Sequence, residues 1–293
     1  MTHNSEKTRQ LDFLNSKEVA QMLGVNVSTI KRWTQSGKLP CQTTAGGHRR
    51  FMMADLINLV NENKSAIVKS NVFRLESEED ARISYHVVKR DYDFLKGFVI
   101  KQALEGRSEK VQQILSGLYM VRSPLHEIYD DLLTPVLWEL GDRWDRGEVS
   151  IIEEHIASQT LRDCTVRLQG MIEIHGTKVG RALLLVPSTE LHDIALKMTD
   201  HLLEEAGYET HFSGQMSPLV KIERIFEKFR PHRLYISVTY IENIESTQQE
   251  IDKLFAVAAS YNTAIFVGGR GFDLLTLPGP AQRIEHFSQL IAH

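Results

Sequence analysis

The chain has 293 residues, 42% of them hydrophobic, which is enough for two or three domains with cores of their own. No apolar run approaches the roughly 20 residues of a transmembrane helix, and the two cysteines are too few for a disulfide framework. The net charge of −4 is uneven, because residues 1–60 contain eight Lys and Arg against four Asp and Glu. We therefore expect a cytoplasmic protein, with no membrane partner, whose basic N-terminal part meets a polyanion.

Residues 12–60 are predicted to form a helix-turn-helix domain, preceded by a disordered tail at residues 1–11. Asn15 and Glu18 have the spacing of a capping box, which marks the start of a helix. A second helix is predicted over residues 27–35, with Asn26 as its cap, and a tight glycine turn separates the two helices. A basic hairpin with glycines at its tip and a further helix complete the domain.

The second helix of a helix-turn-helix enters the major groove of DNA, where hydroxyl and basic side chains contact bases and phosphates. The predicted DNA-binding residues are Ser28, Thr29, Lys31 and Arg32 on this helix, with His48, Arg49 and Arg50 on the hairpin. Trp33 and Phe51 are expected in the core of the domain. The segment NSKEVAQMLGVNVSTIKRWTQSGKL and the GGHRRF hairpin resemble the winged helix-turn-helix of the MerR family. The resemblance implies binding to a double-stranded DNA operator.

A polar linker at residues 61–80 is expected to lead into a four-helix bundle at residues 81–176. Its helices are predicted at residues 86–105, 108–120, 124–146 and 150–174. Ser150 and Glu153 form a second capping-box pattern at the start of the last helix.

Residues 177–293 alternate between apolar strands and amphipathic helices, which is typical of a doubly wound, flavodoxin-like parallel sheet. Strands are predicted at residues 181–187, 208–213, 233–239 and 264–268, and helices at residues 191–206, 218–229, 247–260 and 280–291.

Polar residues and glycines follow successive strands of this sheet, at the edge where such sheets bind ligands. They are Glu190 and His192 after the first strand, Ser237 and Thr239 at the end of the third, and Gly268 and Gly269 at the end of the fourth. His192 can serve as a metal ligand, and an acidic residue two positions earlier can orient its second ring nitrogen. The set predicts a pocket for a long cofactor with a polar tail.

These residues resemble the cobalamin-binding motif DxHxxG, SxL or SxT, and GG, which reads ELHDIA, SVT and GG in this chain. The resemblance implies that His192 is the lower axial ligand of cobalt and that Glu190 orients it. Trp144, followed after a nine-residue gap by Glu154 and His155, resembles the helical cap of the CarH/LitR photoreceptor group. In that group the tryptophan covers an adenosyl group, and the glutamate and histidine line the pocket.

The resemblance implies a non-enzymatic repressor that senses light through adenosylcobalamin, or methylcobalamin, bound between the bundle and the sheet domain. It also implies self-association into a dimer or tetramer. The sequence departs from the family pattern at Ala195 and Thr189, where glycine is usual, and at Asp145, where light-sensing relatives can carry histidine. Two alternatives stay open: a regulator of the same fold controlled by an anti-repressor protein without cobalamin, and a corrinoid-carrying enzyme module.

Overall fold

The computed structural model describes residues 13–62, 77–174 and 176–290. The predicted tail at residues 1–11 and most of the predicted linker lie outside these ranges. The chain divides into two compact units, the first comprising residues 1–124 and 136–160 and the second comprising residues 125–135 and 161–293. No helix in the described ranges is long and apolar enough to cross a membrane.

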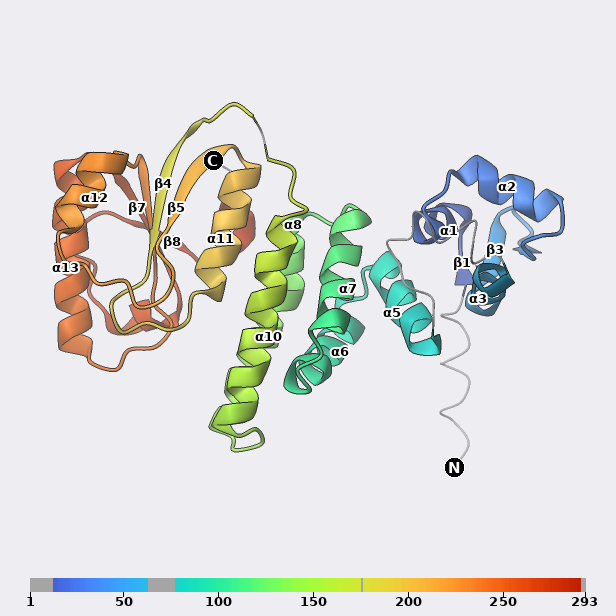
Figure 1. The fold of residues 1–293 in the computed structure, drawn as a ribbon, viewed down its shortest axis with the longest axis horizontal. Helices are drawn as coiled ribbons and strands as arrows, with labels where there is room; N and C mark the ends of the chain where they lie inside the picture. The colour runs from blue at the N-terminus through green and yellow to red at the C-terminus, as the bar shows by residue number, and fades with distance from the viewer. Residues whose placement is uncertain (1–12, 63–76, 175, 291–293) are drawn as a thin grey trace. The chain divides into compact units, whose positions relative to one another are not determined.

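The helix-turn-helix domain lies in the first unit and has the predicted order of elements (Figure 1). Its elements are β1 (Phe13–Leu14), α1 (Ser16–Leu23), α2 (Val27–Gln35), β2 (Gln42–Thr43), β3 (Arg49–Met52) and α3 (Met53–Glu62). The capping box is confirmed, because Asn15 Oδ1 accepts the Glu18 backbone N–H while Glu18 Oε2 accepts that of Asn15. Asn26 occupies the N-cap of α2 but makes no capping side-chain bond, so the prediction that it caps this helix was wrong in that respect. Phe51 is fully buried, as predicted.

Helices make up the rest of the first unit. They are α5 (Glu78–Lys89), α6 (Tyr92–Leu104), α7 (Ser108–Met120), α9 (Thr134–Asp145) and the first half of α10 (Ile151–Gln169). The prediction of one helix over residues 86–105 was wrong, because Arg90 adopts a left-handed conformation and Asp91 caps a new helix. The capping box of Ser150 and Glu153 is confirmed. Lys89 of α5 binds Glu18 of α1 at 2.7 Å and so joins the helix-turn-helix domain to the next helix.

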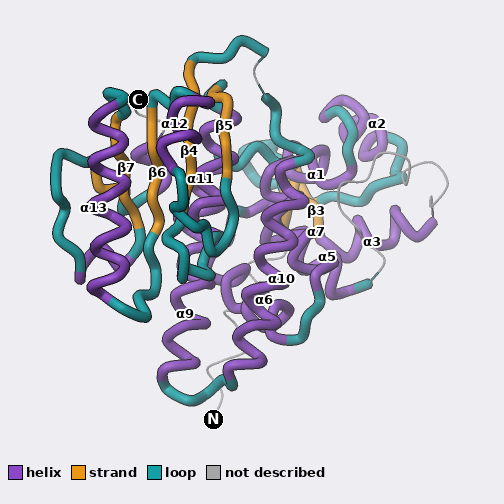
Figure 2. Tube along the Cα trace, turned by 60° about the vertical axis from the view of Figure 1, so that its left-hand side comes forward, coloured by secondary structure: helices purple, strands orange, loops and turns teal. Residues whose placement is uncertain are grey.

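The second unit contains a five-stranded parallel sheet with strand order β5-β4-β6-β7-β8. The strands are β4 (Gly180–Leu185), β5 (Tyr208–Phe212), β6 (Arg233–Ser237), β7 (Ala264–Gly268) and β8 (Gln282–Ile284). In chain order this is 2-1-3-4-5, the flavodoxin-like order, which reverses direction between β4 and β6. One face of the sheet is covered by α11 and the other by α12 and α13 (Figures 1 and 2). These helices span Ile194–Glu205, Ile222–Phe229 and Ile244–Ser260.

The predicted helix at residues 280–291 was wrong. Ile284, Phe287 and Leu290 recur every three residues and therefore imitate one face of a helix. In the structure residues 282–284 instead form β8, which pairs with β7, and a short 3-10 turn follows at Phe287–Leu290. Hydrogen bonding to an open sheet edge has prevailed over the local pattern.

A short segment between α7 and α9 packs with the second unit. It consists of α8 (Leu125–Glu127) and a π-helix (Ile128–Leu133), so the predicted helix over residues 124–146 is not regular throughout. The Tyr129 hydroxyl contacts Nδ1 of the buried His201 at 2.7 Å. The Asp130 carboxylate accepts the backbone N–H groups of Phe287 and Ser288. Side chains of the π-helix therefore contact both α11 and the C-terminal turn.

Candidate functional site

Glu190 is a buried carboxylate at the carboxyl edge of the sheet, where the strand order reverses. It is 2% exposed, and four N–H groups donate to it. Oε1 accepts the backbone N–H of His192 at 2.8 Å, and Oε2 accepts those of Thr239 at 2.5 Å and Tyr240 at 3.0 Å. The fourth donor is the His192 ring, at 2.6 Å from Oε1. Glu190 therefore connects the loop after β4 to the loop after β6.

The hydrogen bonds to Glu190 determine its charge. Burial alone would raise the pKa of Glu190, but bonds from the ring and backbone of His192 and from the backbone of Tyr240 and Thr239 outweigh burial. The net pKa of Glu190 consequently lies below its usual value, and the group is an anion at neutral pH. Because a carboxylate can only accept, the Nδ1 atom of His192 carries the proton in this pair.

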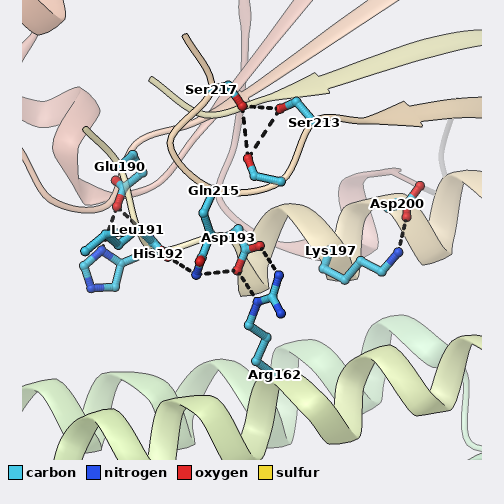
Figure 3. Close-up of polar contacts among 11 residues, drawn as sticks. Arg162, Glu190, Leu191, His192, Asp193, Lys197, Asp200, Ser213, Gln215 and Ser217 are labelled. Carbon is cyan, nitrogen blue, oxygen red and sulfur yellow. Dashed lines mark hydrogen bonds and ion pairs between the residues drawn. The ribbon is translucent and has the colours of Figure 1, made fainter. Parts of the chain in front are cut away.

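The His192 ring projects at the sheet edge, and about half of its side-chain surface (52%) is exposed (Figure 3). With Nδ1 engaged by Glu190, Nε2 is the ring nitrogen that would bind a metal. The arrangement of buried carboxylate, imidazole and exposed face is the one that orients histidine ligands in metal proteins. The sequence-based expectation for this pair agrees with the geometry, although the metal role stays a prediction.

Ser237, predicted to hold the cofactor tail, ends strand β6 and is 4% exposed. Among the residues that the structure describes, its hydroxyl has no hydrogen-bond partner. A buried hydroxyl without a partner is unfavourable unless a ligand or ordered water satisfies it. This observation fits a polar ligand at the carboxyl edge.

The paired glycines lie at the end of strand β7, and the backbone itself requires glycine at one of the two positions. At Gly269, where φ is +95°, an added Cβ would lie 2.2 Å from the carbonyl oxygen of Val238. Val238 also exchanges backbone hydrogen bonds with Gly268 and Gly271. The need for glycine at Gly269 thus comes from the close approach of the two strand ends, and contact with a cofactor stays a prediction for both glycines.

Several residues around His192 were missed by sequence reasoning. Tyr240 lies with its ring centroid 6.5 Å from that of His192. Gln215 Nε2 donates to the Leu191 carbonyl oxygen at 2.6 Å, and the Ser188 hydroxyl and backbone N–H bond to Glu250. No motif in the sequence connects these positions, since their meeting depends on which strands are neighbours.

The predicted cap residues lie in the first unit. Trp144 ends α9 with 45% of its surface exposed. The Glu154 carboxylate on α10 accepts the Ser158 hydroxyl at 2.5 Å, and His155 is 69% exposed. The start of α10 also carries exposed apolar side chains that the sequence did not point to, namely Ile151, Ile152 and Ile156. Exposed apolar side chains in such density are typical of a surface that meets a ligand or partner.

The predicted DNA-binding residues lie on α2 and on the hairpin of β2 and β3. Ser28, Lys31, Arg32, His48 and Arg50 are exposed, whereas Thr29 and Arg49 are partly buried. Gly47 at the tip has φ of +78°, which permits the tight turn between the strands. This basic surface is accessible, and its contact with DNA through these seven residues stays a prediction.

Comparison with protein families matches three parts of the chain. A helix-turn-helix domain model matches residues 13–64, and two B12 binding domain models match residues 99–168 and 180–276. The HTH-type transcriptional repressor CarH of Myxococcus xanthus is 23% identical over 266 residues, covering 85% of this chain and 86% of CarH. The transcriptional repressor DcmR of Methylorubrum extorquens is 38% identical over 56 residues, covering 19% of this chain and 21% of DcmR.

Among solved structures, the monomethylamine corrinoid protein of Methanosarcina barkeri has a similar fold, with a TM-score of 0.56 and 15% identity. The match covers 70% of this chain and 97% of that protein. The predicted combination of helical bundle and parallel-sheet domain is confirmed by this likeness. The chain therefore matches one helix-turn-helix domain and two B12 binding domains and is similar over most of its length to the transcriptional repressor CarH, which supports a DNA-binding regulator that binds B12.

Proposed function

We propose that this protein is a transcriptional repressor that responds to light through adenosylcobalamin. The observation that carries the proposal is the pairing of the buried, anionic Glu190 with the exposed His192 at the switch point of the sheet. This pair would present Nε2 to cobalt in a fixed direction. The similar protein CarH is a transcriptional repressor, which supports repression as the direction of regulation here.

Each group of residues has a defined part in this proposal. His192 would bind cobalt, Glu190 holds its ring, and the buried Ser237 hydroxyl, which has no partner among the described residues, would bond to the tail of the cofactor. Trp144 would cover the adenosyl group, and Glu154 would contribute a carboxylate to its pocket. When bound, adenosylcobalamin would supply a cobalt–carbon bond that light breaks.

Loss of the adenosyl group would leave Trp144 without a partner and would favour a different packing of the helices. Filling or collapsing a cavity the size of a side chain is worth a few kcal/mol, about the coupling needed to shift an assembly equilibrium. The dark form is expected to be the larger oligomer. It should also bind its operator more tightly, because several weakly binding helix-turn-helix domains then bind the same DNA together. Asp145 replaces the histidine that light-sensing relatives can carry after the tryptophan, so we expect the spectrum after illumination to show no second imidazole ligand.

The decisive experiment is purification of the full chain in the dark with added adenosylcobalamin, followed by spectra before and after green light. His192→Ala should weaken binding by at least the roughly 10- to 100-fold that removal of an outer-shell partner costs at metal sites. The matched control is His232→Ala, since His232 is an exposed histidine that precedes β6, at the opposite edge of the sheet. Equal affinity and equal spectra for wild type and His192→Ala would contradict the assignment.

Size-exclusion chromatography and operator binding, each performed on dark and illuminated samples, test the switch itself. Identical elution and identical operator affinity in both states would contradict light sensing. A chain that retains no cobalamin would favour the regulator controlled by a protein partner. Replacement of adenosylcobalamin by methylcobalamin in the same assays shows which form supports switching.

A further inference from the structure

The residue that follows His192 is held in an unusual way. Asp193 occupies the N-cap of α11, where an aspartate normally bonds to the helix backbone, yet its side chain makes no capping bond. Its carboxylate, 1% exposed, is instead bound by the guanidinium of Arg162 on α10. Arg162 Nε donates to Oδ1 at 2.9 Å, and a terminal nitrogen donates to Oδ2 at 2.8 Å (Figure 3).

A third side chain completes this attachment. Gln215, in the loop after β5, donates to the Leu191 carbonyl oxygen at 2.6 Å and to Asp193 Oδ1 at 3.3 Å. The residues on both sides of His192 are therefore bound from other elements, while the backbone N–H of His192 itself donates to Glu190. An exposed imidazole is thus carried by a peptide that is fixed at successive positions (Figure 3).

We propose that Arg162 and Asp193 are a positioning pair for His192, which sets the direction in which Nε2 faces cobalt. This inference rests on the proposed cobalamin ligation by His192. A metal ligand has to be held within about 0.5 Å and 10–20° of its working geometry. Glu190 fixes the rotation of the ring, and the pair fixes the backbone that carries the ring.

The chemistry of the pair suits such a role. A two-pronged guanidinium–carboxylate contact fixes both distance and plane, which a lysine ammonium cannot do. A purely electrostatic role would need only the positive charge. Arg162→Lys keeps the charge but loses the two-pronged contact, so it distinguishes a role of the charge from a role of the geometry. Arg162 also lies on the same helix as Glu154 and His155, so α10 carries both predicted adenosyl-pocket residues and the support of the predicted cobalt ligand.

The test uses the full-length protein loaded with adenosylcobalamin in the dark, as wild type and as Arg162→Gln, Arg162→Lys and Asp193→Asn. We expect Arg162→Gln and Asp193→Asn to bind about 10- to 100-fold more weakly, the usual cost of losing an outer-shell partner. Electron paramagnetic resonance of the same proteins with ¹⁵N-labelled histidine, loaded anaerobically with cob(II)alamin, should show a weakened or absent cobalt–histidine signal in these two variants. Arg162→Lys should recover less than the full affinity and signal.

The matched control is Lys197→Gln. It removes another partly buried ion pair, between Lys197 and Asp200 at 2.7 Å, whose two members both lie on α11. This variant should lower the unfolding temperature without changing the histidine signal. Lower unfolding temperatures with wild-type affinity and signal in Arg162→Gln and Asp193→Asn would overturn the positioning role, leaving a structural one.

The failure of the proposed function would look different. Wild-type protein that binds adenosylcobalamin without a cobalt–histidine signal, or a signal that persists in His192→Ala, overturns the ligation and the positioning pair together. A signal that is lost in His192→Ala but intact in all three pair variants overturns the positioning pair alone.

Discussion

Glu190→Gln removes one charge from the site while keeping the size of the side chain. The loss of stability that it causes follows from the four N–H groups that donate to Glu190. A glutamine offers one acceptor oxygen and one donor NH₂ group in place of two acceptor oxygens. The oxygen is best directed at the backbone N–H groups of Thr239 and Tyr240, which cannot change role. The NH₂ group then faces His192, whose ring can move its proton to Nε2 and accept at Nδ1. The backbone N–H of His192 has no such option and loses its acceptor.

One charge-assisted bond is therefore lost and the others become neutral, at a cost of roughly 3 kcal/mol. For a protein unit of this size that corresponds to a fall of about 10 °C in unfolding temperature. Scanning calorimetry of the cofactor-free protein measures this fall, with Glu139→Gln as control because the ion pairs of Glu139, with Arg143 and Arg146, lie at the surface. With cobalamin added, a proton on Nε2 should also prevent cobalt ligation. Equal unfolding temperatures for Glu190→Gln and wild type would refute the four-donor argument.

Three further predictions concern other parts of the chain. Burial lowers the pKa of His201 from 6.5 to about 4. As pH falls, His201 is therefore protonated in the unfolded chain before it is protonated in the folded one. The free energy of unfolding should therefore be at its full value above about pH 6.5 and lower by about 2 kcal/mol at pH 5. Calorimetry should show a smaller loss of stability between these pH values for His201→Gln, and an equal loss would contradict the assignment. Gly269→Ala should cost more than about 2 kcal/mol, because its Cβ would lie 2.2 Å from a backbone oxygen, whereas Gly268→Ala, with 3.4 Å, should be tolerated. Arg49→Ala and Arg50→Ala should each weaken DNA binding and reduce the salt slope measured by fluorescence anisotropy by about 0.9; unchanged slopes would exclude phosphate contacts.

Capping boxes in the sequence predicted the starts of two helices correctly. The capping boxes at Asn15 and Ser150 were correct because each needs only residues three apart to meet. The strand–helix alternation likewise predicted a parallel sheet, since a crossover connection leaves few other topologies. The position of His192 at the carboxyl edge follows from that topology.

What depends on contacts between distant segments could not be predicted. The sequence suggested that Glu190 orients His192, but its bonds to the Thr239 and Tyr240 backbone require β4 and β6 to be neighbours. The Arg162–Asp193 pair has no local pattern at all, since 31 residues separate its members. Near residue 90 an apolar pattern continued through a left-handed residue, so the break between α5 and α6 was invisible to periodicity.

The contact between Glu18 and Lys89 affects how this helix-turn-helix domain can be exchanged between regulators. Oε2 of Glu18 caps α1, while Oε1 binds Lys89. One side chain therefore caps a helix of the helix-turn-helix domain and attaches that domain to α5. A chimaera joined after residue 60 would keep the cap but lose the lysine, leaving the face that α1 and α3 present to α5 uncovered. The transferable cassette for domain swapping is accordingly residues 13–89, and a foreign sensor should be fused after α5.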